Sequence, residues 1–327
     1  MATKTINAMN RCKECIDSRK SFVLQGGAGS GKTESLKELL LYIKTEQPKA
    51  RVICITHTNA AVDEIVGRVG EQYLISTIHS FLYGLIGRYK KNIKSVISEL
   101  FFVPEMVRAE QLKEQKETDY KKVEHEKYKR AYEKYTSNLY RICRENAEKV
   151  TGKREYDKDP EGYNEFLNKK IRLLNAKIMD IIDDKEYSAI YYNQTKFDGL
   201  SDLSYGHDGL LVLFHLLFEK YPLLGKIISD KYDYIFIDEY QDTQKEVLCD
   251  ILTLSQTYGV AIGLFGDNMQ SIYDEGIDDL DIFINDGTLE SILKQDNFRC
   301  SYEVLDVINS LRLDSLNQNV ALKKLDN

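Results

Sequence analysis

The 327-residue chain lacks any apolar run long enough to cross a membrane. A transmembrane helix needs roughly 18 or more consecutive apolar residues, and no stretch of this sequence approaches that length. The N-terminal sequence, MATKTINAMN, also lacks the apolar core of a secretory signal. These two absences lead us to expect no membrane partner and predict a cytoplasmic protein.

Zinc-type cysteine spacing and an excess of positive charge are also missing. Of the six cysteines, Cys12 and Cys15 form one CxxC pair, and no second pair follows at the spacing of a zinc site. We therefore interpret both as reduced thiols on a helix. The net charge of −7 does not favour nucleic-acid binding by the chain as a whole. A nucleic acid would have to be bound by a local surface.

Two parts of the chain alternate short apolar runs with helical patterns. The predicted strands are residues 22–25, 52–55, 74–76, 234–237 and 260–265, and the predicted helices are 34–44, 59–69, 210–218 and 245–254. Strands that alternate with helices predict an α/β fold whose parallel sheet carries helices on both faces.

Residues 88–205, between these two parts, show no convincing strand pattern. The stretch 105–155 is dense in lysine, glutamate and tyrosine, which suits long solvated helices. We therefore predict an inserted all-helical subdomain. One helix face in this stretch would carry Tyr128, Tyr132, Tyr135 and Leu139. We favour packing over nucleobase stacking as the role of this face.

The sequence GGAGSGKT at residues 26–33 fits the phosphate-binding pattern G-x4-G-K-[ST]. A predicted strand precedes it and a predicted helix follows it, which is the context that the pattern requires. Glycines let backbone N–H groups converge on phosphate oxygens, and the helix N-terminus adds partial positive charge. Lys32 would reach the β- and γ-phosphates, and the Thr33 hydroxyl would bind Mg²⁺. The predicted nucleotide-binding residues are Gly26, Gly27, Ala28, Gly29, Ser30, Gly31, Lys32 and Thr33.

Acidic residues follow directly after the apolar run in YDYIFIDEYQDTQ, residues 232–244. The carboxylate that holds the metal of a P-loop site should end a parallel strand close to the P-loop, and Asp238 meets that description. Glu239 is then placed to accept a proton from the attacking water, which hydrolysis requires and binding does not. The predicted helical insertion accounts for the long separation between Lys32 and Asp238.

Six motifs in order resemble those of UvrD/Rep/PcrA-like superfamily 1 DNA helicases. DEYQDT at residues 238–243 is similar to the DE(F/Y)QDT element of that family, and the P-loop is a second match. The other matching segments are THTNAA (56–61), STIHSF (76–81), GDNMQSIY (266–273) and NFRCS (297–301). The resemblance covers nearly the whole chain. It implies a RecA-like P-loop NTPase lobe, ATP and Mg²⁺ as cofactors, and DNA as the partner.

The resemblance also implies a role for each matching residue. Gln270 would sense the γ-phosphate, Phe298 would stack on the adenine, and Arg299 would place a cation on the γ-phosphate. Thr33 and Asp238 would hold the metal. The implied catalytic residues are Glu239, Gln270, Arg299 and Lys32. The implied DNA-binding residues are Thr58, Asn59, His79, Ser80 and Tyr273.

The family pattern divides the chain into three parts. Residues 1–87 and 206–300 would form the ATP-binding lobe, residues 88–205 the helical subdomain, and residues 301–327 the start of a second RecA-like lobe. The sequence departs from the pattern at residues 274–276, where Asp-Glu-Gly replaces the usual RWRGA-type segment. It also has no counterpart of the family's adenine-reading glutamine ahead of the P-loop.

The leading interpretation is the first motor lobe of an ATP-driven helicase or translocase that binds single-stranded or tailed duplex DNA. As one lobe, it should bind ATP with Mg²⁺, hydrolyse it weakly and unwind nothing. The alternative is a nucleotide-sensing regulatory ATPase that controls a partner nuclease. Helicase-like subunits of Gabija-type antiphage systems look similar, and the departure at residues 274–276 favours this alternative. A relative that acts on RNA is a third interpretation.

Overall fold

A computed structural model of the chain describes residues 7–70, 73–102, 105, 160–270, 280–312, 314 and 316–321. These residues form two compact units. The first unit contains the described residues within 1–93, 191–197 and 205–327, and the second contains those within 94–190 and 198–204.

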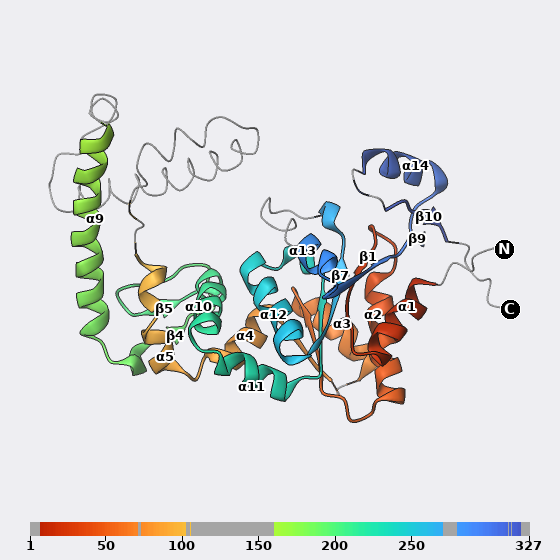
Figure 1. Cartoon of the computed structure of the whole chain (residues 1–327), viewed down its shortest axis with the longest axis horizontal. Coiled ribbons are helices and arrows are strands. Elements are labelled where there is room, and N and C mark those ends of the chain that lie inside the picture. The colour runs from red at the N-terminus through yellow and green to blue at the C-terminus, as the bar shows by residue number, and fades with distance from the viewer. Residues whose placement is uncertain are drawn as a thin grey trace. The chain divides into compact units, whose positions relative to one another are not determined.

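The first unit is built on a six-stranded sheet in the order β3-β2-β6-β7-β1-β8 (Figure 1). Its strands are β1 (Ser21–Gln25), β2 (Val52–Thr56), β3 (Leu74–Thr77), β6 (Tyr234–Asp238), β7 (Ala261–Gly266) and β8 (Leu289–Leu293). Every neighbouring pair is parallel. The predicted α/β fold with a parallel sheet is therefore confirmed.

Helices cover both faces of this sheet, as Figure 1 shows. On one side lie α1 (Ala8–Asp17), α2 (Lys32–Glu46) and α3 (Asn59–Val69). On the other lie α4 (Ile78–Ile86), α10 (His207–Lys220), α11 (Leu223–Lys231) and α12 (Lys245–Tyr258). All positions of β6 and β7 are buried, since a central parallel strand is covered on both faces. Continuous apolar runs such as YIFI therefore predicted these strands well.

Three of the longer elements of the first unit were not predicted from the sequence. These are the helices α4 and α11 and the edge strand β8. In β8, only Leu289 and Ile292 are buried, because an edge strand is less enclosed than a central one. The segment LESIL therefore has neither a continuous apolar run nor a strict alternation, and it gave no strand signal.

Short elements complete the first unit and carry the chain past β8. They are β4 (Tyr191–Tyr192), β5 (Ser204–Tyr205), α5 (Lys90–Lys94), η4 (Tyr240–Asp242), η5 (Asn268–Gln270), α13 (Leu280–Asn285), β9 (Asp296–Asn297), α14 (Tyr302–Leu311) and β10 (Asn319–Val320). β10 pairs in parallel with β9, and both belong to the first unit. That residues 301–327 begin a second lobe stays a prediction.

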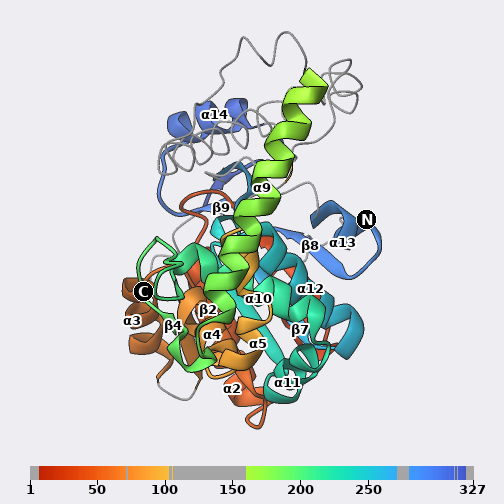
Figure 2. The same cartoon turned by 90° about the vertical axis from the view of Figure 1, so that its left-hand side faces the viewer.

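The second unit contains one long, unbroken helix, α9 (Pro160–Asp183), which Figure 2 shows along its length. η1 (Ile97–Leu100) packs against α9, and η3 (Tyr187–Ala189) follows it. Ile171, Ile178 and Ile182 are buried and share one face of the helix. The predicted tyrosine face at residues 128–139 lies outside the described residues.

Candidate functional site

The P-loop joins the carboxyl end of β1 to α2, in the strand–loop–helix context that its pattern requires. Gly29 and Gly31 have φ angles of +81° and +75°, in the left-handed region that glycine adopts without steric penalty. Gly31 precedes the first turn of α2 and offers it no side-chain cap. Because the first N–H groups of a helix have no intrahelical acceptor, this turn can donate to a phosphate.

Polar contacts hold the two side chains at the end of the P-loop. Lys32 is 7% exposed, and its Nζ donates to the backbone oxygen of Gly26 at 2.8 Å. Thr33 Oγ1 donates to Asp238 Oδ2 at 3.1 Å, although 205 positions separate the two residues in the sequence. The sheet order explains this contact, since only β7 lies between β1 and β6. The two residues predicted to bind Mg²⁺ are therefore brought together.

Asp238 lies in a setting that favours a cation. It is 3% exposed, and burial followed by the neighbouring Glu239 charge raises its pKa to about 6. A divalent cation would supply the missing positive charge, and carboxylate and hydroxyl oxygens are the ligands that Mg²⁺ prefers. Asp238 and Thr33 therefore fit the metal that the sequence predicts.

Glu239 follows Asp238 in an uncommon backbone conformation. Its φ of +52° lies in the left-handed region, where a residue with a side chain is rarely found. Such conformations cost roughly 1–3 kcal/mol and concentrate at functional sites. Here the turn ends β6 and begins η4, so the second carboxylate stands directly after the strand that delivers the first.

A chain of hydrogen bonds links Glu239 to the end of β7. Gln241 Nε2 donates to Glu239 Oε2 at 2.7 Å, and Gln241 Oε1 accepts from the backbone N–H of Asp267 at 3.1 Å. Gln270 Nε2 donates to Asp267 Oδ2 at 2.7 Å. Glu239 and Gln270, both predicted to act in hydrolysis, are thus connected through Gln241 and Asp267.

Arg312 joins the same network, although its sequence context did not predict this role. Its Nη2 donates to Asp267 Oδ1 at 2.7 Å, and its Nη1 donates to Asp267 Oδ2 at 3.1 Å. The side chains of Arg312 and Asp267 are 6% and 2% exposed, so this is a buried ion pair. Burial raises the pKa of Asp267, but the hydrogen bonds from Arg312 and Gln270 outweigh it and lower that pKa. An arginine after a helix is common, so its sequence context gave no signal.

The segment that carries Phe298 and Arg299 lies against the P-loop. The Phe298 N–H donates to the backbone oxygen of Gly29 at 2.9 Å, and Asn297 Nδ2 donates to that of Ala28 at 2.8 Å. Asn297 Oδ1 accepts from the Arg299 N–H at 2.9 Å. The residues predicted to contact the adenine and the γ-phosphate are therefore attached to the phosphate-binding loop itself.

Two buried side-chain atoms near the P-loop lack hydrogen-bond partners within the described part of the chain. They are Ser30 Oγ and Gln318 Nε2. Buried polar groups are nearly always paired in folded proteins. Unpaired polar atoms beside a phosphate-binding loop therefore fit a site that receives a polar ligand, and the residues present fit a nucleotide.

The predicted DNA-binding residues that the structure describes lie where β2 and β3 end, at the same carboxyl edge of the sheet as the P-loop. They stand at the starts of the helices that follow these strands. Thr58 caps α3, accepting from the Ala61 N–H at 3.2 Å, and Asn59 is the first residue of that helix. His79 and Ser80 lie in the first turn of α4. Because β2 and β3 are paired, the structure places these two pairs at neighbouring strand ends. Tyr273 and residues 274–276 lie outside the described residues.

His79 belongs to a small cluster of aromatic rings. Its ring centroid lies 4.5 Å from that of His207, and the Tyr192 hydroxyl is 2.5 Å from His207 Nδ1. Burial and then the charges of His207 and His57 lower the pKa of His79. The imidazole is therefore neutral near pH 7. It can donate a hydrogen bond to a phosphate but cannot form an ion pair with it.

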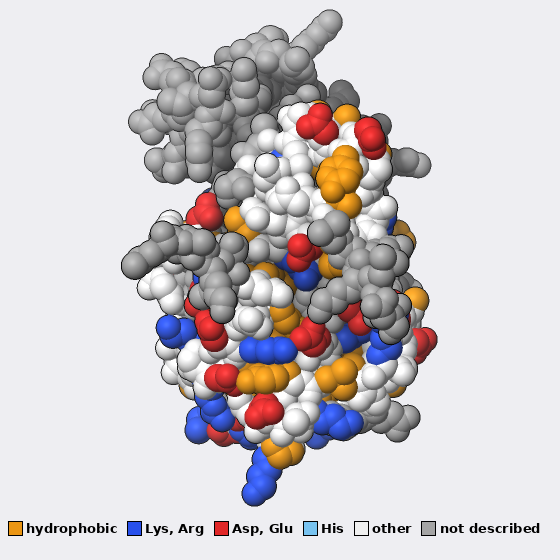
Figure 3. Space-filling view, turned by 90° about the vertical axis from the view of Figure 1, so that its right-hand side faces the viewer, with side chains coloured by type: hydrophobic (Ala, Val, Ile, Leu, Met, Phe, Trp, Pro, Cys, Tyr) orange, Lys and Arg blue, Asp and Glu red, His pale blue; other side chains and the backbone are white. Residues whose placement is uncertain are grey.

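Charges of both signs are interspersed on the face drawn in Figure 3. Elsewhere among the described residues, charges of opposite sign also pair directly, as in Arg11–Glu290 at 2.6 Å and Lys13–Glu38 at 2.8 Å. An alternation of signs gives a weak field, since neighbouring opposite charges offset one another. Among its described residues, this face therefore lacks a broad positive surface that could steer a polyanion.

The thiols of Cys12 and Cys15 are buried on α1. The pKa of each thiol is raised to about 12, and burial is the main cause. The next cause is the charge of Cys15 for Cys12 and the charge of Glu290 for Cys15. Both thiols are therefore protonated near pH 7, and a protonated thiol is a poor metal ligand. Over the described ranges, no group of three or more His, Cys, Asp or Glu side chains could hold a metal ion. Both cysteines lie on one helix as free thiols.

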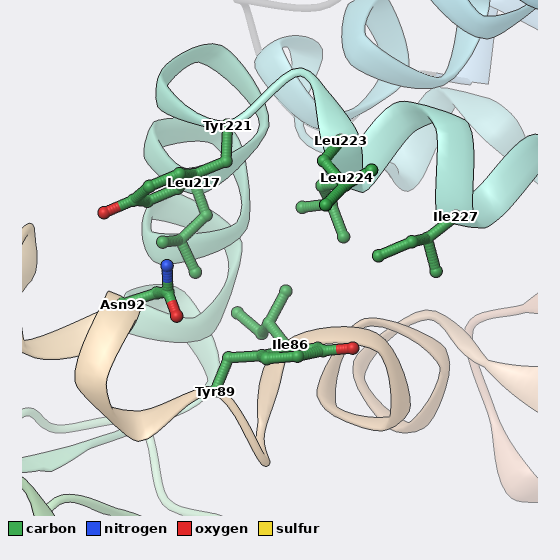
Figure 4. A pocket seen from close by; sticks show the side chains of 8 residues that line it. All are labelled: Ile86, Tyr89, Asn92, Leu217, Tyr221, Leu223, Leu224 and Ile227. Atoms are coloured by element: carbon green, nitrogen blue, oxygen red, sulfur yellow. The ribbon is translucent and has the colours of Figure 1, made fainter.

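An apolar pocket of about 200 Å³ opens between the ends of α4 and α10 and helix α11 (Figure 4). It is lined by Ile86, Tyr89, Asn92, Leu217, Tyr221, Leu223, Leu224 and Ile227. Its wall offers one amide, two tyrosine side chains and otherwise aliphatic groups, so it does not supply groups for phosphate chemistry.

No helix in the part of the chain that the structure describes is both long and apolar enough to cross a bilayer.

Comparison with known proteins agrees with the motif order. The family model described as the UvrD/REP helicase N-terminal domain matches residues 9–274. Gabija protein GajB of Bacillus cereus (strain HuB5-5) is 33% identical over 96% of this chain and 50% of its own length. ATP-dependent DNA helicase PcrA of Bacillus subtilis (strain 168) is 25% identical over 91% of this chain and 38% of its own length. The chain thus spans half or less of the length of these relatives.

Proposed function

The chain belongs to the UvrD/REP helicase family, and on that premise we propose that it is the N-terminal motor lobe of an ATP-dependent DNA helicase or translocase. The observation that carries this proposal is the 3.1 Å contact between Thr33 Oγ1 and Asp238 Oδ2. A P-loop hydroxyl and a strand-end carboxylate are the pair that holds Mg²⁺ beside nucleotide phosphates.

Each polar side chain of the site has a separate task in this proposal. Lys32 leaves its contact with the Gly26 oxygen and donates to the β- and γ-phosphates, while Thr33 and Asp238 hold the metal. Glu239 takes the proton of the attacking water, and Gln241 holds that carboxylate in place. When bound, Mg·ATP supplies the γ-phosphoryl group that water removes.

Three further residues connect this chemistry to the rest of the motor. Gln270 senses the γ-phosphate, and its bond to Asp267 couples it to Glu239. Arg299 stabilises the charge that develops on the transferred group, and Phe298 offers its ring to the adenine. Phe298 is 54% exposed, as a stacking surface must be.

Single-stranded DNA would pass over the ends of β2 and β3. Thr58, Asn59 and Ser80 are exposed there and can donate to phosphates, and His79 can do so in its neutral form. Contacts to the sugar–phosphate chain carry no sequence information, which suits a motor that moves along any sequence. Tyr273 is proposed as a fifth contact on the resemblance alone.

A substitution of the proposed base tests the hydrolytic mechanism. In the complete native protein, Glu239→Gln should leave the Kd for Mg·ATP unchanged and abolish DNA-stimulated phosphate release, because the amide cannot take up a proton. Glu246→Gln, an exposed acid on α12, is the matched control and should behave as wild type. Wild-type turnover by Glu239→Gln would remove Glu239 from the role of base.

A second function is favoured by the similarity to Gabija protein GajB. In this alternative, the chain is a nucleotide-sensing ATPase that regulates a partner nuclease and unwinds little. Strand displacement on a tailed duplex separates the two functions. ATP hydrolysis on DNA without displacement, by the chain in its complete native context, would favour the regulator. Stronger stimulation of ATP hydrolysis by single-stranded RNA than by single-stranded DNA would favour an RNA-directed enzyme instead.

A further inference from the structure

Gln318 occupies a position that the surrounding backbone fixes from two sides. Its N–H donates to Asn309 Oδ1 at 2.9 Å, and Asn309 Nδ2 donates to the Gln318 oxygen at 2.9 Å. The next residue, Asn319, enters β10 and donates to the backbone oxygen of Gln295 at 2.7 Å. Hydrogen bonds from α14 and from the β9–β10 pair therefore position the backbone of Gln318.

The side-chain amide of Gln318 lies against the P-loop. Gln318 is 2% exposed, and a Cβ built on Gly27 would collide first with Oε1 of this amide and would lie 2.7 Å from Nε2. Real Cβ atoms do not come this close to another atom, so glycine at position 27 is what lets the amide approach the loop. The contact joins a residue beyond α14 to the backbone that cradles phosphates.

Nε2 of Gln318 is buried and has no hydrogen-bond partner. A buried donor without an acceptor is costly, and folded proteins rarely keep one without a reason. Packing alone would be served better by an apolar side chain of similar length. Ser30 Oγ, the other unpaired buried atom, belongs to the same loop. Two buried polar atoms without a partner among the described residues therefore lie at the P-loop.

We infer that Gln318 is a nucleotide ligand, whose Nε2 donates a hydrogen bond to an anionic phosphate oxygen held in the P-loop. This inference rests on the proposed function, because it requires the P-loop to bind a nucleotide. Phosphate is the part of the nucleotide that it recognises, since Gly27 belongs to the phosphate-binding backbone and a neutral donor suits an anionic oxygen. The segment after α14 then becomes part of the nucleotide site.

Two substitutions separate this role from packing. Gln318→Met keeps the length of the side chain and removes the donor, and Gln318→Glu replaces the donor by a negative charge. Asn317→Ala, at the exposed neighbouring amide, is the matched control. Dissociation constants are measured by calorimetry for Mg·ATP, Mg·GTP and magnesium tripolyphosphate. Wild type and Lys32→Ala in the same series show whether the P-loop binds nucleotide at all.

Loss of a hydrogen bond to a charged group should weaken binding by about tenfold to a hundredfold in Gln318→Met. Gln318→Glu should weaken it further, and the control should not change it. The loss should be equal for all three ligands, because all carry the phosphates. Without ligand, Gln318→Met should unfold at the same temperature as wild type or a higher one, since the substitution removes an unpaired donor.

Unchanged affinity in both Gln318 variants would overturn the inference while leaving the proposed function intact. A loss confined to Mg·ATP would also overturn it, because Gln318 would then read the base. A lower unfolding temperature of ligand-free Gln318→Met, with affinity unchanged in the folded protein, would assign a packing role. If wild type binds none of the three ligands, the proposed function and this inference fall together.

Discussion

The two halves of the sheet's carboxyl edge hold their polar side chains in different ways. At the ends of β1, β6 and β7, the residues Lys32, Asp238 and Asp267 are buried, and each has a hydrogen-bond partner. At the ends of β2 and β3, Thr58 and Ser80 are exposed. Phosphoryl chemistry requires groups fixed in advance, since misplacement by about 1 Å can cost a hundredfold in rate. A polymer that must slide requires accessible groups instead.

The largest expected effect tests whether burial fixes the nucleotide half. Arg312→Met should lower the free energy of unfolding by about 3–5 kcal/mol, because it leaves the buried Asp267 carboxylate without its counter-charge. Urea denaturation measures this loss. The control is Arg51→Met, whose ion pair with Asp233 has an arginine side chain that is 50% exposed. That pair should contribute at most about 1 kcal/mol. Equal losses from both substitutions would contradict the distinction.

The same substitution has a pH dependence with a definite sign. The pKa of Asp267 is lowered in the folded protein, as the bonds from Arg312 and Gln270 outweigh burial. The ionised Asp267 carboxylate therefore stabilises the folded protein above the ordinary carboxyl pKa, and this contribution is lost as the pH falls through the lowered pKa. The difference in unfolding free energy between wild type and Arg312→Met should be greatest at neutral pH and should shrink in acid. A difference that grows in acid would contradict this assignment.

The next largest effect tests whether the two halves bind different ligands. Lys32→Ala should weaken Mg·ATP binding by about a hundredfold or more, since Lys32 donates charge-assisted bonds to the phosphates. Affinity for single-stranded DNA in the absence of nucleotide should not change. Fluorescence anisotropy with labelled nucleotide and labelled DNA measures both. Lys13→Ala, on α1, is the control and should alter neither. Retained ATP affinity would remove Lys32 from the site.

A smaller effect tests the exposed half. Thr58→Ala removes the cap of α3 and should cost about 1 kcal/mol of stability. It should also weaken single-stranded DNA binding several-fold while the Kd for Mg·ATP stays at its wild-type value. Thr58→Ser keeps the hydroxyl and should restore both properties. An equal loss of affinity for ATP and DNA would show that the halves are not independent.

The smallest effect concerns the charge of His79. Because burial and nearby histidines lower its pKa, His79 is neutral at pH 7.5 and releases no counterion from DNA. The salt dependence of DNA binding should therefore be the same for wild type and His79→Gln at that pH. In acid, below the lowered pKa, the wild-type slope should become steeper by at most about 0.7. A shallower slope for His79→Gln already at pH 7.5 would show that the imidazole is charged.

Local sequence patterns predicted most strands of the sheet but few of the interactions between side chains at its carboxyl edge. Apolar runs located five of its six strands, because central strands are buried on both faces. The P-loop and the Asp238 position followed from motif spacing. The Asp267–Arg312 pair spans 45 positions, and its partners meet only through the path of the chain after β8. No local pattern encodes such a meeting.

Tyr240 and Gln318 show the same limit at single residues. As a sequence letter, Tyr240 only matches an aromatic position of the family. In the structure it is fully buried, packs on Gly266 and donates to Asn268 Oδ1, so it ties η4 to η5. Gln318 looks like one polar residue among several in a loop. Only the structure shows that β10 pairs with β9, that the Gln318 amide lies against Gly27, and that its Nε2 has no hydrogen-bond partner among the described residues.

The strand order sets the sequence of events during synthesis of the chain. β1 and β2 emerge first, yet they do not pair with each other, because β6 and β7 lie between them. β2 can pair early with β3, but its other partner, β6, lies about 180 positions further along the chain. Until β7 arrives, β1 has an open edge, and open apolar edges are prone to aggregate. The six-stranded sheet can therefore be completed only after β7 and β8 have left the ribosome.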